Sequence, residues 1–212
     1  MIIRAFVGLC VMLVGCSTGT TPTADPSSPP IRSTPTPTAA LLDEVDLAAI
    51  VLDPQSPPAG LGLDLLEESP LAVASRPVLA HPGRELPPVL DQPGFVAGRF
   101  VQFSGEPGGL LSWAMLFDTI DNATRSYELY LGEFTSPEAY GFEALPASLG
   151  DIGVCDEGDF VLDVETGFLL HETICLWREA NAVLAAGGYI EDSQVRAVAA
   201  GMDERAQRAL DD

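Results

Sequence analysis

The stretch 171–175, His-Glu-Thr-Ile-Cys, holds the residues most suggestive of metal chemistry. Ligand side chains four residues apart can bind one zinc ion when they share a helix face. The apolar residues on both sides of this stretch instead predict a strand, in which four residues span about 13 Å and cannot chelate one ion. The second histidine of the chain, His81, lies in a proline-rich stretch. We therefore expect no metal site and no cofactor, and interpret His171 as an ordinary strand residue.

Carboxylates are crowded between residues 151 and 165. Oxygen-rich segments can coordinate calcium, but the spacing here does not match the EF-hand loop. The chain has 31 acidic residues against 10 basic ones, so carboxylates also cluster without binding a cation. A solvated loop is the simpler interpretation, and cation binding stays open as the alternative. The residues concerned are Asp151, Asp156, Glu157, Asp159, Asp163 and Glu165.

The composition excludes several classes of protein. All ten basic residues are arginine, so no lysine is present for a Schiff base or a phosphate-binding loop. The formal net charge of −21 disfavours nucleic acid and anionic lipid headgroups as partners. No Gly-x-Ser-x-Gly elbow or dinucleotide fingerprint occurs. The sequence thus favours a domain that binds a ligand or a partner without catalysis. An envelope hydrolase acting on glycan or peptide is the alternative, but with so many carboxylates no catalytic pair can be selected.

Four aromatic side chains on predicted strands are the candidate ligand contacts. Trp113, Phe117, Trp177 and Tyr189 would line a concave sheet face that receives a small ligand or an envelope protein. Large aromatic residues more often belong to the core of a domain, which is the alternative for all four.

The elements that must position these residues occur in two similar series. Each series reads strand, turn, strand and helix, once at 95–135 and once at 168–210. Hairpin connections favour antiparallel pairing, so we predict an α+β fold: an antiparallel sheet built from two hairpins, with helices packed on a face. The order also suggests a strand–strand–helix pseudo-repeat. The predicted strands are 71–79 (an edge strand), 95–103, 110–120, 160–164, 168–178 and 182–190; the predicted helices are 41–52, one capped by Asp121 and ended by Pro137, and one capped by Asp192.

The first residues predict an export signal. Arg4 precedes an apolar run, residues 5–15, which is too short to span a bilayer permanently. The run ends in Leu13-Val14-Gly15-Cys16, which resembles the lipobox of bacterial lipoproteins. This resemblance implies cleavage before Cys16 and a thioether-linked diacylglycerol on its sulfur. An ordinary secretory signal is the alternative.

The domain organisation follows from this start. Residues 1–15 form the predicted signal peptide, and residues 16–39 form a linker rich in Thr, Pro and Ser with too few apolar side chains to fold. Residues 40–212 form one α+β domain. The layout resembles poorly characterised lipoproteins and sensor-type domains of high-GC Gram-positive bacteria. The resemblance implies a lipid-anchored domain on the extracytoplasmic face of the cell membrane, which it contacts through the lipid alone.

Two thiols remain once Cys10 leaves with the signal peptide and Cys16 carries lipid. Cys155 and Cys175 would then lie in an oxidising compartment, where a disulfide is the expected state. A free reactive thiol is the alternative.

Overall fold

The computed structural model describes five stretches of the chain, and for residues 159–163 and 168–170 it describes the backbone without the side chains. The described residues are 40–70, 92–106, 108–135, 143–163 and 168–212. The predicted signal peptide and linker, the predicted edge strand at 71–79, and His81 lie outside them. Every described residue belongs to one unit that begins at Thr38. Of the helices in these stretches, none has the length and apolar character needed to cross a membrane.

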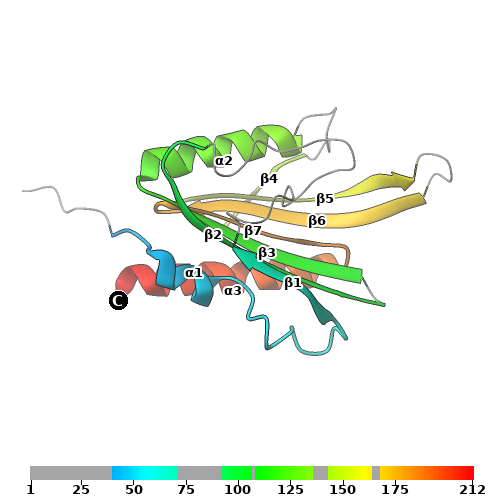
Figure 1. The fold of residues 1–212 in the computed structure, drawn as a ribbon. Helices are drawn as coiled ribbons and strands as arrows, with labels where there is room; N and C mark the ends of the chain where they lie inside the picture. Colours follow the sequence, from blue (N-terminus) through cyan, green and yellow to red (C-terminus); the bar gives the residue numbers. More distant parts are fainter. Residues whose placement is uncertain (1–39, 71–91, 107, 136–142, 164–167) are drawn as a thin grey trace, which may run out of the picture. The chain divides into compact units, whose positions relative to one another are not determined.

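Seven strands form one antiparallel sheet in the order β1-β2-β3-β7-β6-β5-β4 (Figure 1). The predicted hairpins β2–β3 and β6–β7 are both present, and they adjoin through β3 and β7. The predicted α+β class and antiparallel sheet are therefore confirmed. The strands are β1 (Asp64–Pro70), β2 (Phe95–Gly105), β3 (Gly108–Phe117), β4 (Leu145–Ala147), β5 (Ile152–Asp163), β6 (Phe168–Glu179) and β7 (Ala182–Gly188).

Three strands differ from the prediction. The edge strands β1 and β4 were not expected, and β5 begins at Ile152 instead of near residue 160. β1 is mostly exposed and carries Glu67 and Glu68, so it lacks the alternation of a half-buried strand. An edge strand pairs with only one neighbour and tolerates charged side chains. These charges also disfavour pairing with the sheet edge of another molecule.

The helices cover both faces of the sheet, whereas the sequence suggested one face. Helix α2 (Ile120–Thr135) packs on one side, and α1 (Glu44–Ile50) and α3 (Asp192–Asp211) pack on the other (Figure 1). The cause lies in the central strands: every residue of β7 is buried, as are most residues of β3. Strands that are apolar on both faces require cover on both faces.

This arrangement limits the predicted pseudo-repeat. Both strand–strand–helix units occur, and both hairpins lie in the same sheet. A two-fold rotation about an axis perpendicular to the sheet superposes one hairpin on the other and keeps each face of the sheet on its own side. Helix α2 nevertheless packs on one face and α3 on the opposite face. No rotation superposes one whole unit on the other, so the similarity stops at the order of elements.

Two predicted helix caps are shifted by one or two residues. At the start of α2, the hydroxyl of Thr119 accepts a hydrogen bond from the backbone N–H of Asn122 at 3.2 Å, so Thr119 takes the capping place predicted for Asp121. At α3 the N-cap is Glu191, and Asp192 belongs to the first turn, where its carboxylate binds a guanidinium one turn later. A carboxylate in the first turn still interacts favourably with the helix dipole.

The predicted disulfide is present. Cys155 on β5 and Cys175 on β6 are directly opposite partners in the sheet, and their sulfur atoms are 2.04 Å apart. Both side chains are buried in the core below α1 and α3. The bond therefore joins two neighbouring strands beneath the helices.

Candidate functional site

The structure does not bring the candidate aromatic residues to one face. Trp113 and Phe117 lie in the core below α2, where the Trp113 ring is 5.3 Å from that of Tyr130. Trp177 lies in the opposite core. Both tryptophans are 0 % exposed. The register of the strands explains the separation. Trp113 on β3 and Leu176 on β6 pair with the same residue of β7, so their side chains lie on the same face of the sheet. Trp177, the next residue of β6, therefore points to the other face.

Tyr189, the fourth aromatic candidate, follows β7 and packs on the β2–β3 turn. A Cβ atom at Gly109 would lie 2.7 Å from atoms of the Tyr189 ring, so the ring occupies the space that the glycine leaves. The Tyr189 ring is half-buried in this position. Its contact with Gly109 stabilises the end of the hairpin.

The possible metal ligands are dispersed. His171 Nε2 lies 3.9 Å from the carboxylate of Glu157, and both side chains are half-exposed on β6 and β5. The strand predicted for residues 171–175 is present, and Cys175 is held in the disulfide. Asp156 is buried. The side chains of residues 159–165 lie outside the described part, and within the described part no group of three ligand-type side chains could hold a metal ion.

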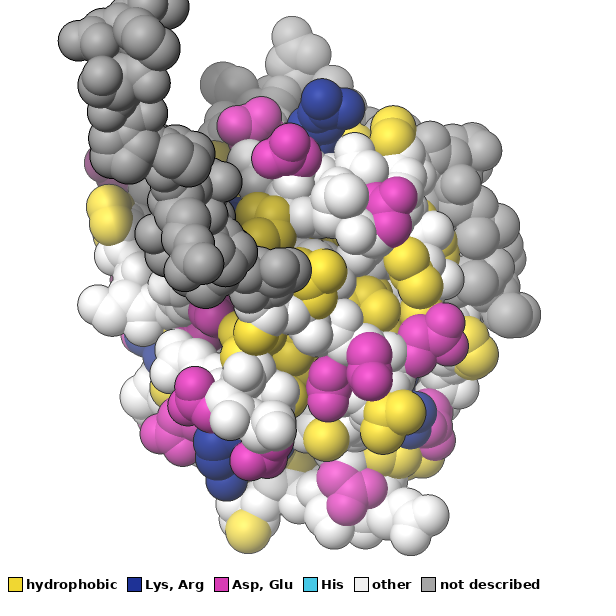
Figure 2. Space-filling view, turned by 90° about the vertical axis from the view of Figure 1, so that its left-hand side faces the viewer, with side chains coloured by type: hydrophobic (Ala, Val, Ile, Leu, Met, Phe, Trp, Pro, Cys, Tyr) yellow, Lys and Arg dark blue, Asp and Glu magenta, His cyan; other side chains and the backbone are white. Residues whose placement is uncertain are grey.

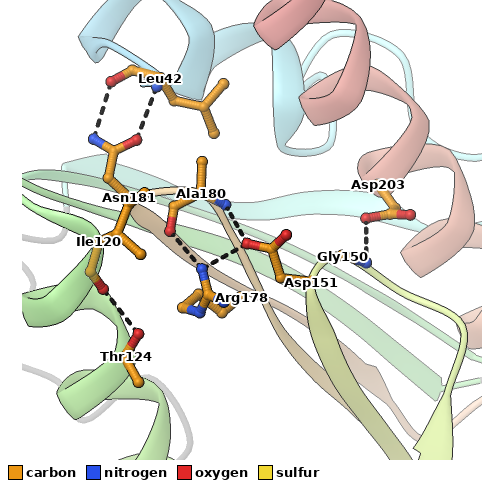
Figure 3. Close-up of polar contacts among 9 residues, drawn as sticks. All are labelled: Leu42, Ile120, Thr124, Gly150, Asp151, Arg178, Ala180, Asn181 and Asp203. Atoms are coloured by element: carbon orange, nitrogen blue, oxygen red, sulfur yellow. Dashed lines mark hydrogen bonds and ion pairs between the residues drawn. The ribbon is translucent and has the colours of Figure 1, made fainter. Parts of the chain in front are cut away.

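A polar cluster holds the β6–β7 turn (Figure 3). The carboxylate of Asp151 is 2.6 Å from Arg178 and also accepts a hydrogen bond from the N–H of Ala180. Arg178 donates in turn to the carbonyl of Ala180 at 2.9 Å. Ala180 has a φ of 47°, in the left-handed region that costs a residue with a Cβ atom energy. These bonds hold both peptide groups of that residue in place.

Asn181, the next residue of the turn, connects three segments of the chain. Its side-chain oxygen accepts from the N–H of Leu42 at 2.8 Å, and its NH₂ group donates to the carbonyls of Leu42 and Phe117. The side chain is 3 % exposed. Asn181 thus fixes the chain where it enters α1 against the end of β3. Figure 3 shows its two bonds to Leu42.

Carboxylates with perturbed pKa values lie on both faces of β6. Burial, aided by the nearby carboxylates of Asp151 and Asp203, raises the pKa of Glu179 from 4.5 to about 7. Burial alone raises the pKa of Glu172 to about 7. Burial also raises the pKa of Asp203, although the N–H of Gly150 donates to it at 2.9 Å and opposes this shift. Glu172 and Glu179 are seven residues apart on one strand, so they point to opposite faces and cannot act on one substrate.

The described residues form an open groove on the helical side that carries α1 and α3. It has a volume of about 720 Å³ and lies between α1, the segment 51–61 and α3. Volumes of roughly 300–1,000 Å³ are typical of small-molecule sites. The walls consist of small residues, Ala48 and Ala49 from α1 and Ala197 and Gly201 from α3. Without large side chains at these positions, the space between the two helices stays unfilled.

The segment 51–61 forms one side of this groove. Pro54, Pro57 and Pro58 prevent α1 from continuing and leave the segment without regular structure. Leu52 and Leu61 from this segment, with Val198 from α3, form the apolar part of the groove. Sequence reasoning missed this site; the available signal was the run of small residues on the face of the last helix that does not contact the sheet.

Arg205 is the single cationic side chain that lines the groove. Its Nε and Nη2 atoms donate to the carbonyl of Ile50 at 3.0 and 2.7 Å, which caps the end of α1. Burial, followed by the charge of Arg208, lowers the pKa of Arg205, but a guanidinium stays protonated at neutral pH. Acidic side chains predominate over basic ones on the face shown in Figure 2, so a groove lined by a cation contrasts with the surface charge.

Comparison with known proteins shows a likeness in fold. No protein-family model and no curated protein sequence matches this chain. The crystal structure of the extracellular domain of PknH from Mycobacterium tuberculosis is similar, with a TM-score of 0.51 and 13 % sequence identity. The match covers 81 % of this chain and 100 % of that one. This chain shares the fold of an extracellular domain. At this identity the similarity concerns the fold and assigns no ligand.

Proposed function

We propose that this protein is an extracytoplasmic binding domain, tethered to the cell membrane by lipid on Cys16, that takes its ligand into the groove between α1 and α3. The groove is the observation that carries the binding role. Its volume fits a small molecule, its lining is mainly apolar, and a cation with a remaining donor lines it.

The extracytoplasmic location rests on several independent observations. The stretch 13–16 resembles a lipobox, and the linker-like segment 16–39 follows it. A disulfide joins Cys155 and Cys175, which suits an oxidising compartment. The fold is shared with an extracellular domain. None of these requires catalysis.

The hydrolase alternative finds less support in this geometry. The groove is lined by one carboxylate, Asp53, which is exposed and accepts a hydrogen bond from the N–H of Gln55 at 2.9 Å. The two glutamates with pKa values near 7 point to opposite faces of β6 and do not line the groove. Glycoside hydrolysis needs two carboxyl groups that flank one bond.

Lipidation is tested by expressing the full chain in a bacterium and following incorporation of a labelled fatty acid. Cys16→Ser should abolish both the label and membrane association, while Cys10→Ser, a control within the same predicted signal, should leave both intact. Label retained in Cys16→Ser, or absent from the unaltered chain, would refute the anchor.

Binding in the groove is tested by identifying small molecules that copurify with the protein. Ala197→Phe places a ring in the groove, whereas Ala200→Phe places the same ring on an exposed part of α3 away from it. A molecule retained by the unaltered protein and by Ala200→Phe, but lost from Ala197→Phe, supports the groove. Identical retention by all three proteins contradicts it.

A further inference from the structure

We propose that the ligand of the groove is a single-chain amphiphile with a carboxylate head, bound head-first to Arg205 with its alkyl chain along the apolar lining. This inference rests on the proposed binding function and adds the chemical class of the ligand. It follows from two observations, the unused donor capacity of Arg205 and the shortage of polar groups elsewhere in the groove.

The geometry of Arg205 leaves one face of the guanidinium available. Nε and Nη2 are engaged with the carbonyl of Ile50. Among the described residues, no acceptor forms a hydrogen bond with Nη1. This atom lies over Gly201, where an added Cβ would be 3.5 Å from it. The missing side chain at Gly201 therefore leaves Nη1 accessible from the groove.

Arg205 also forms no ion pair within the described structure, although the charge of the neighbouring Glu204 acts on its pKa. Arg99, Arg178 and Arg196 each form an ion pair with a carboxylate. No described carboxylate lies within 4.0 Å of Arg205, although the chain has 31 acidic residues. A partly buried guanidinium held in a fixed orientation by the backbone is well suited to receive an anionic group.

The rest of the lining selects against a polar ligand. Asp53, Ser56, Gln194 and Arg205 are the lining residues with polar side chains, and the other ten are aliphatic, proline or glycine. The backbone of α1 and α3 is engaged in helical hydrogen bonds, and in the segment 51–61 the N–H groups of Val51, Leu52, Ser56 and Leu61 also donate to acceptors within the protein. A peptide or sugar would leave many of its polar groups unpaired here, whereas an alkyl chain requires no partners. A carboxylate at one end of an apolar chain matches this distribution.

The first test compares three probes with equal alkyl chains: dodecanoate, 1-dodecanol and dodecyltrimethylammonium. Each is titrated as a monomer against the full chain carrying Cys16→Ser, so that no acyl group of the protein competes. Dodecanoate should bind roughly 10-fold more tightly than the alcohol, a difference of about 1.4 kcal/mol, because a hydrogen bond to a charged acceptor is stronger than one to a neutral hydroxyl. Equal affinity for the acid and the alcohol, or tighter binding of the cation, overturns the proposed ligand class.

Variants at Arg205 test the ligand class, and variants elsewhere in the groove test the binding site. Arg205→Gln keeps a donor for the carbonyl of Ile50 but removes the charge, so the ratio of the affinities for the acid and the alcohol should fall from roughly 10 to about 1. Ala197→Phe should weaken both probes, and Ala200→Phe neither. An unchanged acid-to-alcohol ratio in Arg205→Gln refutes the role of Arg205.

The experiments distinguish a wrong ligand class from a wrong binding site. Copurification of another small molecule that Ala197→Phe excludes would overturn the carboxylate class and leave the groove as a binding site. Binding of dodecanoate that neither Ala197→Phe nor Arg205→Gln reduces would overturn the proposed place and class together. Association of dodecanoate with the protein only within vesicles, and not as a monomer, would also overturn the inference.

Discussion

Replacing Glu172 by glutamine should stabilise the protein above pH 7 and have little effect at pH 5. Burial raises the pKa of this carboxyl group from 4.5 to about 7. The folded protein then binds a proton more strongly than the unfolded chain, so the contribution of the neutral acid is present below pH 4.5 and is lost as pH rises through 7. The difference corresponds to at most about 3 kcal/mol. Glutamine imitates the neutral acid and avoids this loss.

The assay is the free energy of unfolding by urea, measured between pH 5 and pH 8. The unaltered protein should gain stability as the pH falls over this range, with about 2–3 kcal/mol of the gain due to Glu172. Glu172→Gln should lack that portion and exceed the unaltered protein at pH 8. Glu128→Gln replaces an exposed glutamate on α2 and serves as the control for the loss of one negative charge.

Glu179 still contributes to the pH dependence of stability in Glu172→Gln, because its pKa is also raised to about 7. The slope of stability against pH should therefore decrease in Glu172→Gln without disappearing. If the curves of Glu172→Gln and the unaltered protein run parallel, the carboxyl group does not titrate in this window and the burial argument is refuted. A matching stabilisation in Glu128→Gln would assign the effect to net charge instead.

Three further changes test the packing of the domain. Asn181→Ala removes three buried hydrogen bonds to backbone groups and should lower the free energy of unfolding by about 3 kcal/mol; a loss below about 1 kcal/mol would contradict the bonds described. Replacing both Cys155 and Cys175 by alanine should lower the same quantity by about 3 kcal/mol, since the bond closes a loop of sequence separation 20; unaltered thermal and urea unfolding would refute this. Gly132→Ala, on an exposed part of α2 with no atom within 4 Å of the added Cβ, should raise the stability by about 1 kcal/mol, and a destabilised variant in urea unfolding would show that the position is constrained.

The hairpins and long helices could be predicted because their residues carry local signals. Aromatic and β-branched residues mark β2 and β6, and a tight turn separates β6 from β7. The placement of helices on both faces could also have been inferred, because the sequence of β7, Ala-Val-Leu-Ala-Ala-Gly-Gly, has no polar face to expose. β1 carries no such signal, since its position depends on backbone pairing with β2.

The candidate site was harder to predict because it depends on long-range register and on missing side chains. Trp113 and Trp177 point to opposite faces through the pairing of β3, β7 and β6, which no local pattern reveals. The groove results from small residues such as Ala197 and Gly201, which are ordinary residues in a helix. Arg205 became a candidate only when its position beside Ile50, far away in the sequence, was known.

The bonds of Asn181 have a mechanical consequence. A pull on the chain ahead of residue 40 reaches the described domain first at Leu42, where the amide of Asn181 holds both backbone polar groups. These bonds would be loaded before the strand pairs of the sheet. Once they broke, the load would pass to α1, which the buried side chains of Leu47 and Ile50 and the bonds from Arg205 to the Ile50 carbonyl still hold. Tension on the proposed tether would thus reach Ala48 and Ala49, in the wall of the groove, only after the bonds of Asn181 had given way.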